Sequence, residues 1–155
     1  DFVPYSVTPV SFDELIEQVD YLMVQVPLTA ETEGMIGEKE LKKMKPTSVL
    51  INTSRGPLVD NDALYRALKE GWISAAGVDD TVEEPAKKRD WKPDNPLFQL
   101  DNIIITPHSA YYSEESIHEA RLRASEEVVR VLSGNPPLSP VNRVKLTDGS
   151  YSRAS

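Results

Sequence analysis

The stretch of residues 49–60 constrains the fold more than any other part of the chain. It opens with an apolar, β-branched run, which is typical of a buried strand. Gly56 and Pro57 break the chain directly after Arg55, and Asp60 can cap the helix that follows. Arg55 is therefore predicted to lie in a tight loop at the carboxyl end of a strand.

A guanidinium at that position is well placed to bind an anion. Ligands of open α/β sheets bind beyond the carboxyl ends of the strands. The planar fork of donors on Arg55 matches a carboxylate or a phosphate group. The alternative is that Arg55 pairs with a neighbouring acid on the surface, as single charged loop residues usually do. This stretch by itself leaves both interpretations open.

Apolar runs alternate with amphipathic segments along the rest of the chain. The patterns predict strands over 21–26, 48–52, 72–79 and 103–105, and helices over about 12–19, 38–44, 60–71 and 113–133. Strands that alternate with helices imply right-handed βαβ crossovers. The predicted fold class is therefore α/β, with a parallel sheet, helices on both of its faces and a long C-terminal helix.

The composition excludes several classes of function. The 155 residues are 39% hydrophobic and 27% charged, which suits one globular domain. A net charge of -8 disfavours nucleic-acid and anionic-membrane partners. The chain has no Cys and two His, so neither a disulfide framework nor a metal centre is expected. No apolar run approaches the ~20 residues of a membrane span and no signal peptide opens the chain, so a cytoplasmic protein is expected.

Candidate site residues follow each of the four predicted strands. They are Pro27, Arg55, the acids from Asp79 to Glu84, and His108, and a parallel sheet would bring them to one edge. His108 is either a hydrogen-bonded loop histidine or, beside a carboxylate, a group that exchanges a proton near neutral pH. Glu84 taken alone is more typical of a solvated carboxylate. Asp79 must find donors if it is buried.

Three blocks of the sequence resemble the D-isomer-specific 2-hydroxyacid dehydrogenases. They are residues 52–60, Asp79 together with 84–85, and residues 106–110, and the loop 26–32 is similar to the family's cofactor-facing loop. The family includes the phosphoglycerate dehydrogenases and the C-terminal-binding-protein corepressors. The aromatic residues that follow His108 are most similar to the corepressor-like branch.

The resemblance implies hydride transfer between a nicotinamide cofactor and C2 of a small 2-hydroxy or 2-keto acid. By this similarity His108 is the acid/base, Glu84 is the carboxylate that favours its protonated form, and Arg55 holds the substrate carboxylate. Asp79 would face the nicotinamide carboxamide. NAD is the expected cofactor and NADP is the alternative. The residues that the resemblance places at the cofactor are Val26, Pro27, Thr32, Thr53, Ser54, Arg55, Asp79, His108 and Ala110.

The sequence also departs from the family pattern. Gln25 stands where the family often has His, and Asp80 with Thr81 stands where an apolar pair is usual. The G-x-G-x-x-G turn and the ribose-binding acid do not occur. Residues 1–142 are therefore predicted to form part of a Rossmann-type NAD-binding domain with its return helix, and residues 143–155 a flexible tail.

Two functions of different classes remain open at this point. One is an NAD-dependent, phosphoglycerate-dehydrogenase-like enzyme, homodimeric in its full-length form and inactive as this fragment alone. The other is a corepressor-like module that senses NAD, binds proteins and keeps a vestigial site. The catalytic trio of Arg55, Glu84 and His108 is common to both branches, so the sequence alone does not choose between them.

Overall fold

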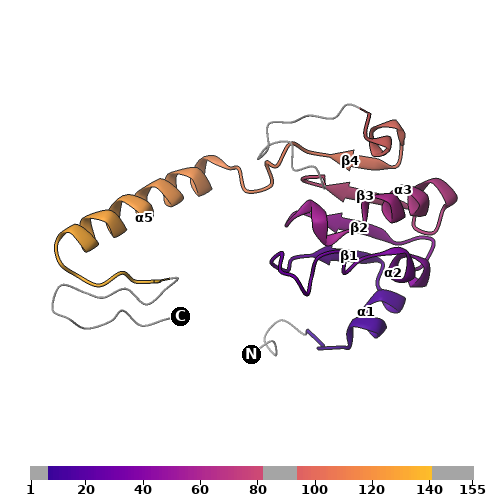
Figure 1. Cartoon of the computed structure of the whole chain (residues 1–155), viewed down its shortest axis with the longest axis horizontal. Helices are drawn as coiled ribbons and strands as arrows, with labels where there is room; N and C mark the ends of the chain where they lie inside the picture. The colour runs from indigo at the N-terminus through magenta and orange to yellow at the C-terminus, as the bar shows by residue number, and fades with distance from the viewer. Residues whose placement is uncertain (1–6, 82–93, 141–155) are drawn as a thin grey trace. The chain divides into compact units, whose positions relative to one another are not determined.

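The structure is a computed structural model that describes residues 7–81 and 94–140, in two compact units that meet in sequence at Ala110 and Tyr111. The first unit holds a four-stranded, fully parallel sheet in the order β1-β2-β3-β4 (Figure 1). Its strands are β1 (Tyr21–Val24), β2 (Val49–Asn52), β3 (Ala75–Val78) and β4 (Ile103–Ile105). Its helices are α1 (Phe12–Gln18), α2 (Glu38–Lys43) and α3 (Asn61–Glu70), with 3-10 turns η2 (Gly56–Leu58) and η3 (Pro96–Gln99).

The helices of this unit pack on one face of the sheet. Because the strand order follows the chain order, right-handed crossovers through α2 and α3 fall on the same side. Alternate strand residues point into that interface and form one core with the helices. The core contains Ile16, Leu22, Val24, Leu41, Leu50, Leu64, Ala67, Leu68, Ala76 and Val78, all with at most 5% of their surface exposed.

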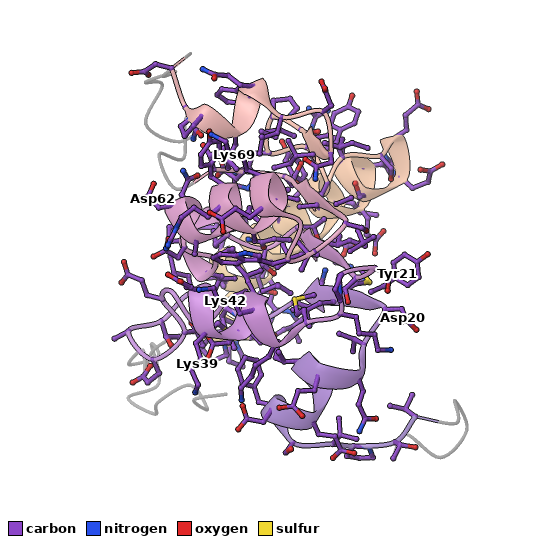
Figure 2. All side chains as sticks on the ribbon, turned by 90° about the vertical axis from the view of Figure 1, so that its right-hand side faces the viewer. Asp20, Tyr21, Lys39, Lys42, Asp62 and Lys69 are labelled. Atoms are coloured by element: carbon purple, nitrogen blue, oxygen red, sulfur yellow. The ribbon has the colours of Figure 1, made fainter. Side chains whose placement is uncertain are left out.

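The opposite face of the sheet is open within this unit. Tyr21 is 70% exposed, Met23 58% and Ile104 72%, and the ring of Tyr21 projects into solvent (Figure 2). The predicted parallel sheet and its flanking helices are present, but in the described part of this unit the helices line one face only. A strand order that runs in a single direction accounts for this, because it puts every crossover on the same side.

Two strands, β1 and β3, are at least two residues shorter than the sequence pattern predicts. β1 ends at Val24, which pairs with Asn52 at the end of β2, so residues 25–26 lie beyond the ladder. β3 begins at Ala75 because the Trp72 N–H donates to the Ala67 carbonyl at 2.8 Å, which places Trp72 in the turn after α3.

Local signals set the ends of the helices as predicted. The Ser11 hydroxyl accepts from the Glu14 N–H at 3.3 Å, and the Asp60 carboxylate accepts from the Ala63 N–H at 2.8 Å. Gly71 ends α3 in the left-handed region with φ 75°.

Replacing Gly71 with Ala should lower the free energy of unfolding by about 1 kcal/mol, because a Cβ disfavours the left-handed conformation. A Cβ at Gly71 would meet no atom within 4 Å, so the cost is conformational and not steric. A Cβ at Gly77 would also meet no atom within 4 Å, but the backbone of Gly77 is not left-handed. Gly77→Ala is therefore the matched control. Urea unfolding of both variants measures the difference, and equal effects would contradict the explanation.

The second unit contains α5 (Glu114–Leu132), close to the predicted 113–133. Ser113 caps its start, and Gly134 follows its end with φ 81°. Its predicted apolar stripe is exposed within this unit, with Val128 at 57% and Val131 at 48%. The predicted tail at 143–155 lies outside the described residues. None of the helices in the described ranges combines the length and apolar character needed to cross a membrane.

Candidate active site

The carboxyl ends of the four strands are joined to one another by hydrogen bonds. Gln25 Nε2 after β1 donates to Thr53 Oγ1 after β2 at 2.7 Å. The Asp79 N–H after β3 donates to the Asn52 carbonyl at 2.9 Å. The His108 N–H, in the loop after β4, donates to the Asp79 carbonyl at 2.6 Å. The prediction that these strand ends meet at one edge is confirmed.

A buried asparagine shapes the turn that carries Arg55. Asn52 is 2% exposed; its Nδ2 donates to the Arg55 carbonyl at 2.8 Å and its Oδ1 accepts from the Ser54 N–H at 3.1 Å. Arg55 is exposed, and its Nη1 donates to the Ser54 carbonyl at 2.8 Å. This role of Asn52 was not predicted from the sequence, although a polar residue that ends an apolar strand before a turn is typical of such a turn-forming side chain.

The loop after β1 is held by Thr32. Its hydroxyl donates to the Pro27 carbonyl at 2.7 Å and accepts from the Thr29 N–H at 2.8 Å. Val26 and Thr32 are half-buried, whereas Pro27 and Thr53 are exposed at the edge. The structure therefore brings Pro27 and Thr32 together, and their role at a cofactor remains a prediction.

Asp79 holds the loop that contains His108. Oδ1 accepts from the Thr106 hydroxyl and from the Ser109 N–H at 2.8 Å, and Oδ2 accepts from the Ala110 N–H at 2.8 Å. Burial, with only 4% of the residue exposed, acts to raise the pKa of Asp79, but these hydrogen bonds and the nearby His108 outweigh it and the pKa is lowered. Asp79 is therefore expected to be an anion at neutral pH.

The same carboxylate can accept one more hydrogen bond. A carboxylate oxygen has two lone pairs, and among the described residues Oδ1 accepts two hydrogen bonds whereas Oδ2 accepts one. The remaining site on Asp79 Oδ2 suits the amide N–H of a nicotinamide. The edge thus fits the nicotinamide end of a dinucleotide. No Gly-rich turn for a pyrophosphate occurs anywhere in the sequence.

His108 contacts an acid that was not predicted as its partner. Nδ1 of His108 lies 3.0 Å from Oδ2 of Asp80, whose side chain is 4% exposed against 27% for the imidazole. The partner implied by the resemblance, Glu84, lies outside the described residues. The available signal was that Asp80 stands where the family usually has an apolar residue, next to an acid already singled out.

The described edge therefore combines three kinds of group. Arg55 offers a cation for a carboxylate, His108 offers an imidazole beside a buried acid, and Thr53 offers an exposed hydroxyl. Such a set can orient a small organic acid and exchange a proton with it.

Comparison with known proteins assigns the chain to a family. Residues 1–110 match the model described as D-isomer specific 2-hydroxyacid dehydrogenase, NAD binding domain. A glyoxylate reductase of Thermococcus litoralis is 45% identical over 142 residues, which cover 89% of this chain and 40% of the relative. A glyoxylate reductase of Korarchaeum cryptofilum is 42% identical over 134 residues, covering 86% and 39%.

A solved structure agrees with these matches. The D-isomer specific 2-hydroxyacid dehydrogenase from Lactobacillus delbrueckii ssp. bulgaricus, in its NAD complexed form, superposes with a TM-score of 0.81 at 36% identity, covering 88% of this chain and 44% of that chain. The chain spans about two-fifths of the length of the curated relatives it matches. It belongs to the D-isomer specific 2-hydroxyacid dehydrogenase family, whose NAD-binding domain its residues 1–110 match.

Proposed function

We propose that this chain supplies the catalytic edge of an NAD-dependent enzyme that interconverts a small 2-keto acid and its D-2-hydroxy acid. The observation that carries the proposal is the His108 imidazole held 3.0 Å from the buried Asp80 carboxylate, at the sheet edge that also carries Arg55. A general acid must lie within hydrogen-bond reach of the atom that takes its proton, and its ring must be oriented toward that atom. The family membership makes hydride transfer the reaction that fits this edge.

The proposed chemistry divides between three parts of the site. The nicotinamide, when bound, supplies or accepts the hydride at C2 of the substrate. His108 holds the proton that the substrate oxygen takes up during reduction. Because Nδ1 faces Asp80, the geometry of the ring directs Nε2 away from that acid, and Nε2 is proposed to deliver the proton.

Arg55 is proposed to bind the substrate carboxylate. One of its five N–H donors is used on the Ser54 carbonyl, which steadies the guanidinium against its own turn. The other donors can form a bidentate pair with a carboxylate, which fixes the orientation of the keto group for attack. Val26, Pro27, Thr32, Thr53, Ser54, Asp79 and Ala110 are proposed to line the nicotinamide, and Glu84 to act with the catalytic pair.

A corepressor-like, NAD-sensing function is the second candidate. The observation that favours it is an exposed aromatic pair directly after the catalytic loop. Tyr111 and Tyr112 are 64% and 66% exposed, with ring centroids 6.4 Å apart in an edge-to-face arrangement. Exposed tyrosines of this kind are enriched at protein interfaces.

Turnover separates the two candidates. We expect the intact protein that carries this chain to oxidise NADH with at least one acid from a panel of glyoxylate, pyruvate, hydroxypyruvate and phosphohydroxypyruvate. Glyoxylate heads the panel because two relatives are glyoxylate reductases. The phosphorylated acid tests the phosphoglycerate-dehydrogenase-like branch, and NADPH in a parallel series tests cofactor choice. NADH binding without turnover on any acid would contradict the enzyme and favour the corepressor-like function.

Two further proposals concern the assembly and the location of the intact protein. A homodimer is expected for the intact protein, and light scattering on the purified material measures it. A cytoplasmic location is expected as well, and fractionation of the source cells tests it.

A further inference from the structure

We propose that Asp80 is a positioning residue that fixes the His108 imidazole through Nδ1. This inference rests on the proposed function for its kinetic consequence, and on the structure alone for the pairing. The contact is 3.0 Å between Nδ1 of His108 and Oδ2 of Asp80. The resemblance assigns that kind of role to Glu84, whereas Asp80 stands where the family usually has an apolar residue.

The Asp80 carboxylate is itself held in place. Its Oδ1 accepts from the N–H of Thr81 at 3.0 Å, a bond within the buried part of the unit. With Oδ1 fixed by the backbone, Oδ2 has a defined position and faces the imidazole. A carboxylate anchored at one oxygen can therefore dictate the ring orientation at the other.

The surroundings strengthen the interaction. Asp80 is 6% exposed and lines a small cavity together with polar residues, Asn52, Asn61 and Thr81, and apolar ones, among them Leu64, Val78 and Leu97. A buried carboxylate is costly unless a donor or a cation compensates it. The His108 imidazole, 27% exposed, lies with Nδ1 3.0 Å from Oδ2, and a proton on Nδ1 lowers the cost of the buried charge.

Two successive acids then control one histidine. Asp79 holds the main chain, through its own carbonyl to the His108 N–H at 2.6 Å and through its carboxylate to the next two backbone N–H groups. Asp80 holds the side chain. His108 has φ 53°, a left-handed conformation that few residues other than Gly adopt and that the surrounding contacts must maintain.

Two acids in the described part of the chain act on His108 through charge. Among the described residues, Asp79 acts on it through the electrostatic interaction that lowers the pKa of Asp79, and Asp80 acts through the ring contact. Glu83 and Glu84 lie outside the described residues, so Glu84→Gln accompanies the Asp80 variants in the test.

Imidazole nitrogen NMR on this chain tests the pairing directly. The chain has two histidines, and His118, exposed on α5, is the internal reference. We expect the neutral form of His108 to carry its proton mainly on Nδ1. Asp80→Val should shift it toward the Nε2–H tautomer, which predominates for an imidazole in water, while His118 stays unchanged. Asp62→Asn, at an exposed acid on α3, removes a charge elsewhere and should change neither (Figure 2).

Kinetics on the intact protein test the consequence. Asp80→Val should lower kcat for keto-acid reduction by about tenfold to a hundredfold with little change in KM, because the imidazole is displaced and substrate binding is not. Asp80→Asn keeps the side-chain volume and an acceptor oxygen, so it decides the question if Asp80→Val does not fold. It should also lower kcat with little change in KM, but by less than Asp80→Val, because an amide can still accept from Nδ1.

The outcomes separate this inference from the proposed function. An unchanged His108 tautomer in folded Asp80→Val overturns the positioning role, as does a kcat in Asp80→Asn equal to that of the parent where Asp80→Val does not fold. A tautomer shift in a protein whose parent form turns over no keto acid supports the pairing and contradicts the proposed function. An effect of Glu84→Gln on the tautomer equal to that of Asp80→Val would assign the role to Glu84 instead and overturn the inference.

Discussion

Replacing His108 with Gln in the intact protein should lower the rate of keto-acid reduction by about a hundredfold to ten-thousandfold, the usual loss when a general acid is removed. Gln cannot deliver a proton to the substrate oxygen, although it is similar in size to His. The imidazole is 27% exposed at the sheet edge, so the substitution should leave the core of the first unit intact. Steady-state oxidation of NADH by the preferred keto acid measures the effect.

The second histidine provides the matched control. His118→Gln alters an exposed residue of α5 and should leave the rate within about twofold of the parent. NADH binding by His108→Gln, measured by fluorescence titration, should stay close to that of the parent. A loss smaller than tenfold in His108→Gln would remove the imidazole from the reaction and leave the corepressor-like function as the better proposal.

Asp79→Asn should lower the free energy of unfolding at pH 7 by about 2–3 kcal/mol, the cost of leaving a buried donor facing a group that cannot accept its hydrogen bond. The Asp79 carboxylate accepts hydrogen bonds from Thr106, Ser109 and Ala110. The side-chain amide of the variant keeps one acceptor oxygen, but its NH₂ group is a donor and faces at least one of these donors. Urea unfolding of the chain measures the change. Asp62→Asn on α3 is the control, and it should shift stability by less than about 0.5 kcal/mol.

The same pair of proteins has a defined pH dependence. The pKa of Asp79 is lowered in the folded state from its ordinary value of 3.8, because hydrogen bonds outweigh burial. The stabilisation by its charge is therefore fully present above pH 3.8 and is lost as the pH falls through the lowered folded pKa. The difference in the free energy of unfolding between the parent and Asp79→Asn should stay constant from neutral pH down to about pH 3.8 and become smaller below it. A gap that is unchanged in stronger acid would contradict the assigned role of the charge.

Much of the fold could be predicted because its signals are local. Ser11, Asp60 and Gly71 mark helix ends through bonds or backbone angles that involve only a few neighbouring residues, and all three act as predicted. The β-branched runs became the strands of a parallel sheet, and the right-handed crossover placed the polar ends of those strands at one edge. The position of Arg55 in the turn after β2 followed from the same reasoning.

The identity of the partners at that edge could not be predicted in this way. Asp79 was predicted to face a nicotinamide, which stays a prediction, but the sequence did not predict the three hydrogen bonds that its carboxylate accepts from the loop of His108. Asn52, buried at the end of β2, determines the turn of Arg55 through two bonds that depend on where the strand stops. The predicted role of Glu84 stays a prediction, because that residue lies outside the described ranges.

By itself, the sequence determined the α/β class, the family and the residues that gather at the carboxyl edge, because strand periodicity, capping and turn chemistry act over a few residues. Only the tertiary structure decided that the helices α1 to α3 share one face, that Asp79 holds the backbone of the loop that contains His108 and that Asp80 contacts Nδ1 of His108. The physical reason is that these contacts join segments about 30 residues apart in sequence, such as Asp79 and Ser109. Which side chain reaches which depends on strand register and loop path, and no local pattern encodes either.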